Sequence, residues 1–280
     1  IYLHVSRQRL LLDSYGYWCI TDPKDFISGI HITFKGEPGT DAGGLTREWI
    51  TYLIRELLNP KYGIFIKNDN QTYNLNPSFE LNLFNTECLK MAGGIIALSM
   101  IKKTSINAHL STSLLRQILH QEIHIDDMKE SDELLYNSFQ SILESEDVIP
   151  LDLVFSIDEE SQNGKLNHIN LIENGENIKV NNENKHEYDK LYANHKLKNS
   201  ISNQMKAFCD GFESIISYDI IKMFTPKELD MIICGKSYID IENMKKYVIY
   251  EGEYDKDHPV IVMFFNVISK WSQEDLSKLI

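Results

Sequence analysis

The sequence contains no long hydrophobic run, and this absence bears first on membranes. A helix that spans a bilayer needs about 18 or more consecutive apolar residues. The most apolar stretch, from Gly93 to Ile101, is followed directly by Lys102 and Lys103. We therefore expect no membrane span. The first residues, Ile1 to Val5, also lack the basic segment and the long apolar run of a secretory signal peptide.

Basic residues are few relative to acidic ones. The chain has 28 Lys and Arg against 41 Asp and Glu, so its formal net charge is -13 and its isoelectric point is near 5.1. A chain of this charge is repelled by a phosphate backbone, and we expect no nucleic-acid partner. A protein partner that presents a basic face fits the charge better.

Cysteine is also rare, and its spacing argues against disulfide and zinc frameworks. Cys19, Cys88, Cys209 and Cys234 are far apart and include no CxxC pair. Three of them lie in apolar or helical patterns, where a buried thiol packs as a small hydrophobic side chain. We expect reduced cysteines and hence an intracellular protein, cytoplasmic and compatible with the nucleus.

The composition that is present suits a folded, soluble protein. At 280 residues, with 42% hydrophobic residues, the chain can bury a sizeable core as one large domain or two modest ones. It begins with isoleucine instead of methionine, so we expect it to be a piece of a longer protein.

Apolar periodicity predicts helices with a few short strands. Alternation from Ile30 to Phe34 indicates a half-buried strand. Helical spacing from Leu45 to Leu57 predicts a helix that stops before Asn59-Pro60, since proline cannot continue it. Phe84 to Met100 is almost wholly apolar, which is typical of a helix buried on most sides.

The middle of the chain predicts a helix, a strand and a hairpin. Ser131 can cap a helix whose apolar face holds Leu135, Phe139, Ile142 and Leu143. A strand is expected from Leu151 to Ile157, after Pro150. Within Glu159–Asn184, two alternating runs indicate a hairpin: Leu166, Ile169 and Leu171, then Ile178 and Val180.

Helices are expected again toward the end of the chain. One carries Tyr188, Leu191, Tyr192 and His195, and the next runs from Ile201 to Phe212. Thr225–Glu228 forms a capping box with proline at the first helical position, and Gly235 ends that helix. A last helix is expected from Ser272.

The loop Gly39–Thr46 has the spacing of a phosphate-binding loop. Leu45, however, stands where such a loop needs the lysine that reaches the phosphates. We therefore interpret the glycines as a tight strand-to-helix turn that uses positive φ angles, without a nucleotide.

His120 and His124 are four residues apart and could share one helix face, as a pair of metal ligands would. No third ligand accompanies them at a convincing spacing, and the ordinary alternative is a solvated acidic face beside Asp126 and Asp127. We expect no metal site. There is also no G-x-S-x-G motif, so the residues by themselves indicate no active site.

Several short segments, in their order and spacing, resemble the HECT domain of ubiquitin ligases. Three lie near the start: Phe34–Glu37, Asp41–Trp49 and Asn59–Phe65. The later ones are Asn181–Lys185, Gln204–Phe208 with Gly211–Phe212, Glu228–Leu229 with Ile233–Gly235, and Tyr250–Gly252 with Tyr254. The resemblance covers essentially all 280 residues.

The resemblance implies an α+β, mainly helical fold. The family's domain has a large lobe that binds the ubiquitin-conjugating enzyme and a small lobe whose cysteine accepts ubiquitin as a thioester. Residues 1–280 resemble the large lobe, the HECT N-lobe, with a large helical subdomain and a smaller inserted α/β subdomain at about residues 127–199. All four cysteines align within this lobe. The catalytic C-lobe would follow residue 280 and is missing, so the chain alone should be inactive.

The family's groove for the conjugating enzyme lies in the smaller subdomain. By the resemblance its pocket residues are Leu135, Phe139, Leu151, Leu153, Tyr188 and Tyr192. The aromatics Phe139, Tyr188 and Tyr192 could otherwise be core residues. Members that bind a second ubiquitin carry aromatics where this chain has Lys67 and Ser161-Gln162, so we expect weak binding of free ubiquitin.

The sequence is thus interpreted as part of a ubiquitin-protein ligase, a transferase. The implied partners are a ubiquitin-conjugating enzyme, ubiquitin carried as a thioester, and protein substrates bound by regions outside this chain. No cofactor is expected. The alternative is a noncatalytic helical interaction module, and a Thr-Cys pair near the end of the parent protein would separate the two.

Overall fold

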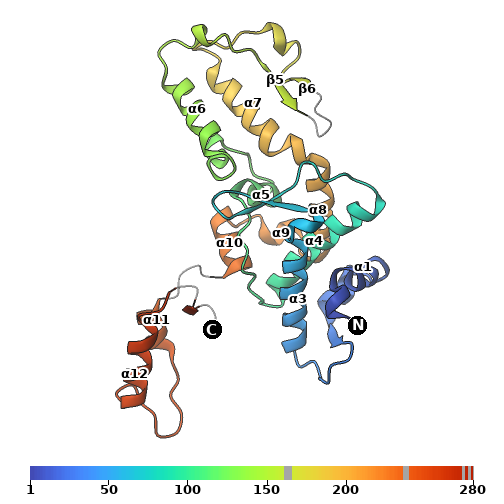
Figure 1. The fold of residues 1–280 in the computed structure, drawn as a ribbon, viewed down its shortest axis with the longest axis vertical. Helices are drawn as coiled ribbons and strands as arrows, with labels where there is room; N and C mark the ends of the chain where they lie inside the picture. The colour runs from blue at the N-terminus through green and yellow to red at the C-terminus, as the bar shows by residue number, and fades with distance from the viewer. Residues whose placement is uncertain (161–165, 236–239, 273–274, 277–278, 280) are drawn as a thin grey trace. The chain divides into compact units, whose positions relative to one another are not determined.

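The computed structural model describes residues 1–280 apart from 161–165, 236–239, 273–274, 277–278 and 280. The chain forms two compact units, Ile1–Cys234 and Gly235–Ile280. Helices predominate, and the described strands pair as β1 with β2, β3 with β4 and β5 with β6 (Figure 1). The predicted mainly helical α+β class is therefore confirmed.

A parallel pair of strands opens the chain. β1 (Tyr2–Val5) pairs with β2 (His31–Phe34), and Leu3 lies opposite Ile32. Alternate side chains on both strands are buried, because successive residues of a strand point to opposite faces. η1 (Arg7–Arg9), α1 (Leu10–Ile20) and α2 (Pro23–Ser28) connect the two strands. The strand predicted at Ile30–Phe34 is confirmed.

The glycine-rich loop is a tight turn that is organised by one carboxylate. Gly43 has a φ of +102°, and α3 (Gly44–Leu57) begins directly after it. The Asp41 carboxylate accepts hydrogen bonds from the amides of Ile32 and Gly43, each at 2.8 Å, and from the Thr46 hydroxyl at 2.5 Å. This carboxylate occupies amide groups that a bound phosphate would need, which supports the interpretation of a structural turn.

Three helices predicted from periodicity build the larger hydrophobic core. They are α3, α4 (Leu83–Ile101) and α8 (Ser202–Ile215). Between α3 and α4 lie η2 (Pro60–Tyr62) and the antiparallel strands β3 (Phe65–Lys67) and β4 (Tyr73–Leu75). Among the described helices, none combines the length and apolar character needed to cross a membrane.

A second hydrophobic cluster gathers residues between Ile123 and Leu197. Its elements are η3 (Ile125–Glu130), α6 (Glu133–Glu144), η4 (Ile149–Leu151), β5 (Ser156–Glu160), β6 (Leu166–Asn170), η5 (Gly175–Asn177) and α7 (Lys185–Leu197). In Figure 1, α6, α7, β5 and β6 lie together. α5 (Thr112–Ile118) precedes this group, η6 (Asn199–Ile201) leads from it to α8, and the Gln117 side chain donates to the Leu197 carbonyl at 3.0 Å.

Two details of this region correct the sequence predictions. The N-cap of α6 is Asp132, whose side chain accepts from the Leu135 amide at 2.9 Å, and Ser131 lies one residue before it. The predicted hairpin has different partners, because β6 pairs with β5 while Ile178 and Val180 follow a separate path. Asn174, with a φ of +54°, and η5 separate the two runs that we expected to pair.

The end of the first unit agrees with the capping prediction. α9 (Tyr218–Ile221) precedes α10 (Pro226–Cys234), and the Thr225 amide donates to the Glu228 carboxylate at 2.8 Å. Gly235 follows with a φ of +79°.

The second unit contains α11 (Ile241–Tyr247) and α12 (Pro259–Ile268), which share a small apolar cluster around Phe265 and Ile268. The helix expected from Ser272 falls partly outside the described residues.

Candidate functional site

An aromatic cluster joins α6 to α7. The ring of Phe139 lies 4.6 Å from that of Tyr192 and 6.1 Å from that of Tyr188, measured between centroids. Phe155 meets Tyr188 edge to face at 5.4 Å. Tyr188 and Tyr192 share one side of α7 because residues four apart lie on the same helix face.

The structure brings together five of the six residues that the resemblance implied for docking. Phe139 and Tyr188 belong to the second cluster, and Leu135, Leu153 and Tyr192 pack against it. The sixth residue, Leu151, is 52% exposed and lies outside that cluster.

The residues alone left Phe139, Tyr188 and Tyr192 as either surface or core side chains, and the structure buries two of them. Phe139 is 3% exposed and Tyr188 is 5% exposed. Burial also raises the pKa of Tyr188 to about 12, so its phenol is neutral at physiological pH. Both side chains are core residues that can support a binding surface from below. Of the remaining four residues, Leu135, Leu153 and Tyr192 are half-buried and Leu151 is exposed.

Leu151 and Leu153 do not alternate along one strand as predicted. Leu151 ends η4, and Asp152 follows in the left-handed region with φ +49°. The backbone becomes extended only afterwards, where the Phe155 amide donates to the Ile178 carbonyl at 3.0 Å and Leu153 accepts from Val180 at 2.8 Å. Pro150, which lacks an amide hydrogen, favours the turn of η4 over a strand there.

Sequence reasoning missed two exposed apolar residues on the elements that carry these side chains. Leu134 on α6 is 82% exposed, and Ile149 on η4 is 62% exposed. A signal for each was present. Leu134 stands beside Leu135 although helical spacing places only one of the pair on the buried face, and Ile149 belongs to an apolar run interrupted by Pro150.

A buried lysine holds the end of α6 against α7. The Lys185 ammonium donates to the carbonyls of Leu143 and Ser145, each at 2.7 Å, and Lys185 is 8% exposed. These carbonyls belong to the last turn of the helix and the residue that caps it, where a cation is favoured by the helix dipole. The contact fixes the two helices that carry the aromatic cluster.

Asp189 is an ionisable residue whose side chain is buried. It is 2% exposed, and neither carboxylate oxygen has a hydrogen-bond partner among the described residues. Burial raises the pKa of this carboxyl to about 7, against a smaller opposing effect of Lys185. Removing a carboxylate from water without a partner disfavours its charged form.

The cysteines lie in surroundings that do not promote reactivity. Burial raises the pKa of the Cys88 and Cys209 thiols to about 12 and also raises that of Cys234. A nucleophilic cysteine needs the opposite shift, since the thiolate is the reacting form. Cys19 is exposed on α1. Cys88, Cys209 and Cys234 therefore have pKa values shifted in the direction opposite to that of a catalytic cysteine.

The two histidines considered as a metal pair do not share a helix face. His120 follows α5 with a φ of +51°, stacks on Tyr218 at 4.2 Å and lies 3.1 Å from the Glu213 carboxylate. His124 is the N-cap of η3, and its amide donates to Asp127 at 2.9 Å. The shared helix face that would have made His120 and His124 a ligand pair is therefore absent.

The structure does bring another set of potential ligands together. The ligand atoms of His109, Asp230 and Cys234 all lie within 4.8 Å of one another. His109 precedes α5, and the other two residues lie on α10.

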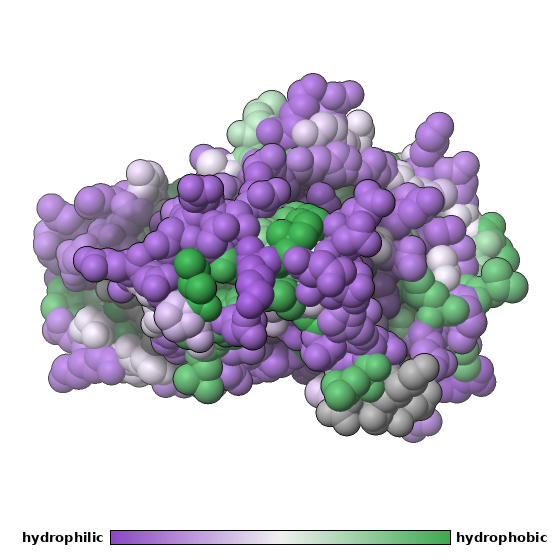
Figure 2. Space-filling view, turned by 90° about the horizontal axis from the view of Figure 1, so that it is seen from above, coloured by the Kyte–Doolittle hydropathy of each residue, from purple (hydrophilic) through white to green (hydrophobic). Residues whose placement is uncertain are grey.

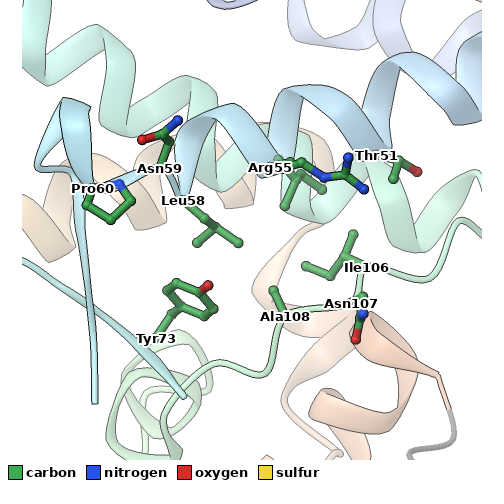
Figure 3. Close-up of a pocket in the computed structure, with 10 residues that line it drawn as sticks. Thr51, Arg55, Leu58, Asn59, Pro60, Tyr73, Ile106, Asn107 and Ala108 are labelled. Atoms are coloured by element: carbon green, nitrogen blue, oxygen red, sulfur yellow. The ribbon is translucent and has the colours of Figure 1, made fainter. Parts of the chain in front are cut away.

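A cavity of about 410 Å³ lies elsewhere in the first unit (Figure 3). It is bounded by the end of α3, Pro60, Tyr73 on β4 and the segment Ile106–Ala108. Arg55 and Thr51 also line it, and none of the six residues implied by the resemblance does. It contains no paired acid and base or nucleophile that would make it an active site.

The face seen in Figure 2 is mainly hydrophilic, and its hydrophobic residues form small, separate patches.

Comparison with known proteins assigns the family. The HECT-domain (ubiquitin-transferase) family matches residues 51–280. E3 ubiquitin-protein ligase RSP5 of Saccharomyces cerevisiae is 32% identical over 281 residues, covering 100% of this chain and 34% of the yeast protein. E3 ubiquitin-protein ligase pub3 of Schizosaccharomyces pombe is 33% identical over 278 residues, or 99% of the chain and 35% of that protein.

A third relative, E3 ubiquitin-protein ligase Nedd-4 of Drosophila melanogaster, is 33% identical over 282 residues, covering 99% of the chain and 28% of its own length. The chain belongs to the HECT-domain family of ubiquitin transferases, which confirms the resemblance drawn from its motifs. It spans about a third of the length of the yeast relatives.

Proposed function

We propose that the chain is the large N-terminal lobe of a HECT-type ubiquitin ligase and that it docks a ubiquitin-charged conjugating enzyme. The smaller α/β subdomain at about residues 127–199 carries the docking surface. The observation that carries the proposal is the aromatic cluster of Phe139, Tyr188 and Tyr192, which joins α6 to α7 beside exposed apolar residues.

The docking surface has a rigid floor and a small exposed rim. Phe139 and Tyr188 are buried, and the contact between their rings packs α6 against α7. The rim consists of the side chains that keep exposed surface: Leu135, Leu151, Leu153 and Tyr192, with Leu134 and Ile149 on the same elements. A few apolar and aromatic anchors usually supply most of the affinity of such an interface.

The proposed ligase transfers ubiquitin by thioester exchange. In the whole ligase, a cysteine thiolate in the catalytic lobe attacks the thioester carbonyl that links ubiquitin to the conjugating enzyme, and the enzyme's own thiolate leaves. A substrate lysine amine then attacks the new thioester and releases the catalytic thiolate. The present lobe contributes by holding the donor, because positioning converts an encounter between separate molecules into a reaction within one complex.

Two surface variants and one control test the docking surface. Leu151→Ala and Tyr192→Ala should each weaken binding of a ubiquitin-charged conjugating enzyme about tenfold, which corresponds to about 1.4 kcal/mol. Ile20→Ala is the matched control, since Ile20 is 82% exposed on α1. Titration calorimetry measures all three. Equal affinity of the Leu151 and control variants would contradict the assignment.

A second experiment concerns catalysis. With activating enzyme, conjugating enzyme, ubiquitin and ATP, the 280-residue chain should form no reducible ubiquitin adduct, because its buried thiols have raised pKa values. Adding the downstream segment of the parent protein should create that adduct. A parent that docks the conjugating enzyme but never forms the adduct would instead indicate a noncatalytic interaction module.

Free ubiquitin should bind this lobe weakly. The resemblance implies that members binding a second ubiquitin carry an aromatic side chain at the position of Lys67. Lys67 is exposed at the end of β3, with its ammonium 5.7 Å from the centre of the Tyr73 ring. Ser161 and Gln162 occupy the second position at which such an aromatic side chain is expected, and they lie outside the described residues. An NMR titration of the lobe with ubiquitin tests this, and saturable shifts at micromolar concentration would contradict it.

A further inference from the structure

The set of His109, Asp230 and Cys234 is assembled from parts of the chain that are 121 residues apart. Asp230 and Cys234 are four residues apart on α10, so both side chains project from one face of that helix. His109 comes from the segment that precedes α5. Sequence spacing could not associate His109 with α10, and a metal at this set would depart from the expectation, drawn from His120 and His124, that the chain has no metal site.

The backbone around these residues is held firmly in place. The Ile106 amide donates to the Ile233 carbonyl at 3.0 Å, which ties the segment to α10. The Tyr73 amide donates to the His109 carbonyl at 2.8 Å, and the Cys234 thiol donates to the Ala108 carbonyl at 3.0 Å. A cation would therefore meet ligands whose positions are largely fixed before it binds, which reduces the entropy lost on binding.

The distances fit a small tetrahedral site after modest adjustment. His109 Nδ1 lies 2.8 Å from Asp230 Oδ2, and Cys234 Sγ lies 3.4 Å from Asp230 Oδ1. Bonds from zinc to nitrogen, oxygen and sulfur are about 2.0–2.3 Å, which places the ligand atoms of a tetrahedral site roughly 3–4 Å apart. All three atoms already lie within 4.8 Å of one another.

We propose that His109, Asp230 and Cys234 form a binding site for one zinc-like divalent cation. The donor set determines this class. On metal binding the Cys234 thiol would give its proton to solvent and exchange its hydrogen bond to Ala108 for a bond to the metal. An imidazole nitrogen, a thiolate and a carboxylate suit zinc or cobalt, whereas magnesium and calcium prefer oxygen ligands only. The proposal is independent of the docking function.

A cavity reaches two of the three proposed ligands. A cavity of about 430 Å³ is lined by His109 and Asp230 together with Thr225 and Glu130. Glu130 is already engaged, because its carboxylate accepts from the amide and hydroxyl of Thr112 at 2.8 and 2.5 Å. Water entering through this cavity would supply the fourth ligand of a tetrahedral site. The bound cation would tie the last turn of α10 to the segment before α5.

Cobalt titration of the reduced, full 280-residue chain tests the proposal. One equivalent of Co²⁺ should produce the near-ultraviolet absorption of a cobalt–thiolate bond, and one equivalent of Zn²⁺ should abolish it. His109→Gln should weaken cobalt binding by tenfold or more, and Cys234→Ala should remove the absorption. Cys19→Ala is the control, because Cys19 is exposed and would be the natural ligand for adventitious metal.

Folding of the variants is checked by circular dichroism. The His109 side chain is 41% exposed, so His109→Gln should stay folded even if Cys234→Ala does not. Zinc should raise the melting temperature of the wild type and not of His109→Gln. Absence of the cobalt absorption, or its loss in Cys19→Ala alone, would overturn the proposal and leave His109 and Asp230 as a hydrogen-bonded pair without a metal.

Discussion

Gly93 on α4 lies directly against the carbonyl group of Phe208 on α8. A Cβ atom at Gly93 would sit 2.0 Å from that oxygen, and a Cβ at Gly211 on α8 would sit 1.8 Å from the Lys90 carbonyl oxygen. Real side chains do not approach so closely. The two central helices therefore meet backbone to backbone, and the larger core depends on glycine at both positions.

Gly211→Ala should destabilise the protein by about 1–3 kcal/mol or more, because the added methyl group forces the helices apart. The control is Gly16→Ala on α1, where a Cβ meets nothing within 4 Å. That change should stabilise the protein by roughly 0.5–1 kcal/mol, since alanine loses less entropy in a helix. Denaturant unfolding of both variants measures the difference, and equal midpoints would refute the close packing.

Phe139→Ala should lower stability by about 3–5 kcal/mol, because it removes a buried ring from the second cluster. Leu151→Ala should change stability by no more than about 0.5 kcal/mol, because Leu151 is exposed. Thermal unfolding separates the two. If Phe139→Ala melts with the wild type and only loses partner affinity, Phe139 is an exposed anchor after all.

Lys185→Met keeps the aliphatic length of the side chain and removes the ammonium group that donates hydrogen bonds to the end of α6. The carbonyls of Leu143 and Ser145 then lose their partner, which should cost about 1–3 kcal/mol. Lys190→Met is the control, since its ammonium is exposed and 3.4 Å from Glu122 and should matter by at most about 1 kcal/mol. Hydrogen exchange at the Ser145 amide should accelerate in the Lys185 variant alone.

Asp189 should make stability fall as the pH rises. Its carboxyl pKa is about 7 in the folded protein and near 3.8 when unfolded, so the folded state binds more protons between those values. The favourable contribution is complete below about pH 4 and is lost as the pH passes about 7. Asp189→Asn should remove this dependence and raise stability at pH 8 by a few kcal/mol.

The control for this pH dependence is Asp152→Asn. Asp152 is exposed and paired with Lys179 at 2.7 Å, so its replacement should give no gain at pH 8. Denaturant unfolding at pH 5 and pH 8 compares the variants. If the free energy of unfolding changes with pH in the same way in the wild type and in Asp189→Asn, then Asp189 is ionised in the folded state.

Much of the fold could be predicted because its signals are local. Helical spacing located α3, α4, α7 and α8, and the Thr225–Glu228 capping box located the start of α10. Such patterns depend on residues three or four apart, which the sequence displays directly. The turn at Gly43 could be predicted for the same reason, since its positive φ needs glycine.

The remaining features depend on contacts between distant residues or on backbone geometry that periodicity does not register. Helical spacing placed Phe139 and Tyr188 on the correct faces, but only the packing of α6 on α7 decides that both are buried. Pro150 and the left-handed Asp152 replaced an expected strand with a turn. The meeting of His109 with Asp230 had no local signal at all.

The carboxylate of Asp41 also bears on the order in which the chain folds. Its partners Ile32 and Thr46 lie within ten residues of it, whereas Lys90 and Gly211 must close a loop of more than a hundred residues. Short loops close at a smaller entropic cost. We therefore expect the unit of β2, the turn and the start of α3 to form in the folding transition state. Asp41→Ala should slow refolding more than it speeds unfolding in stopped-flow experiments, and the reverse result would place this unit late.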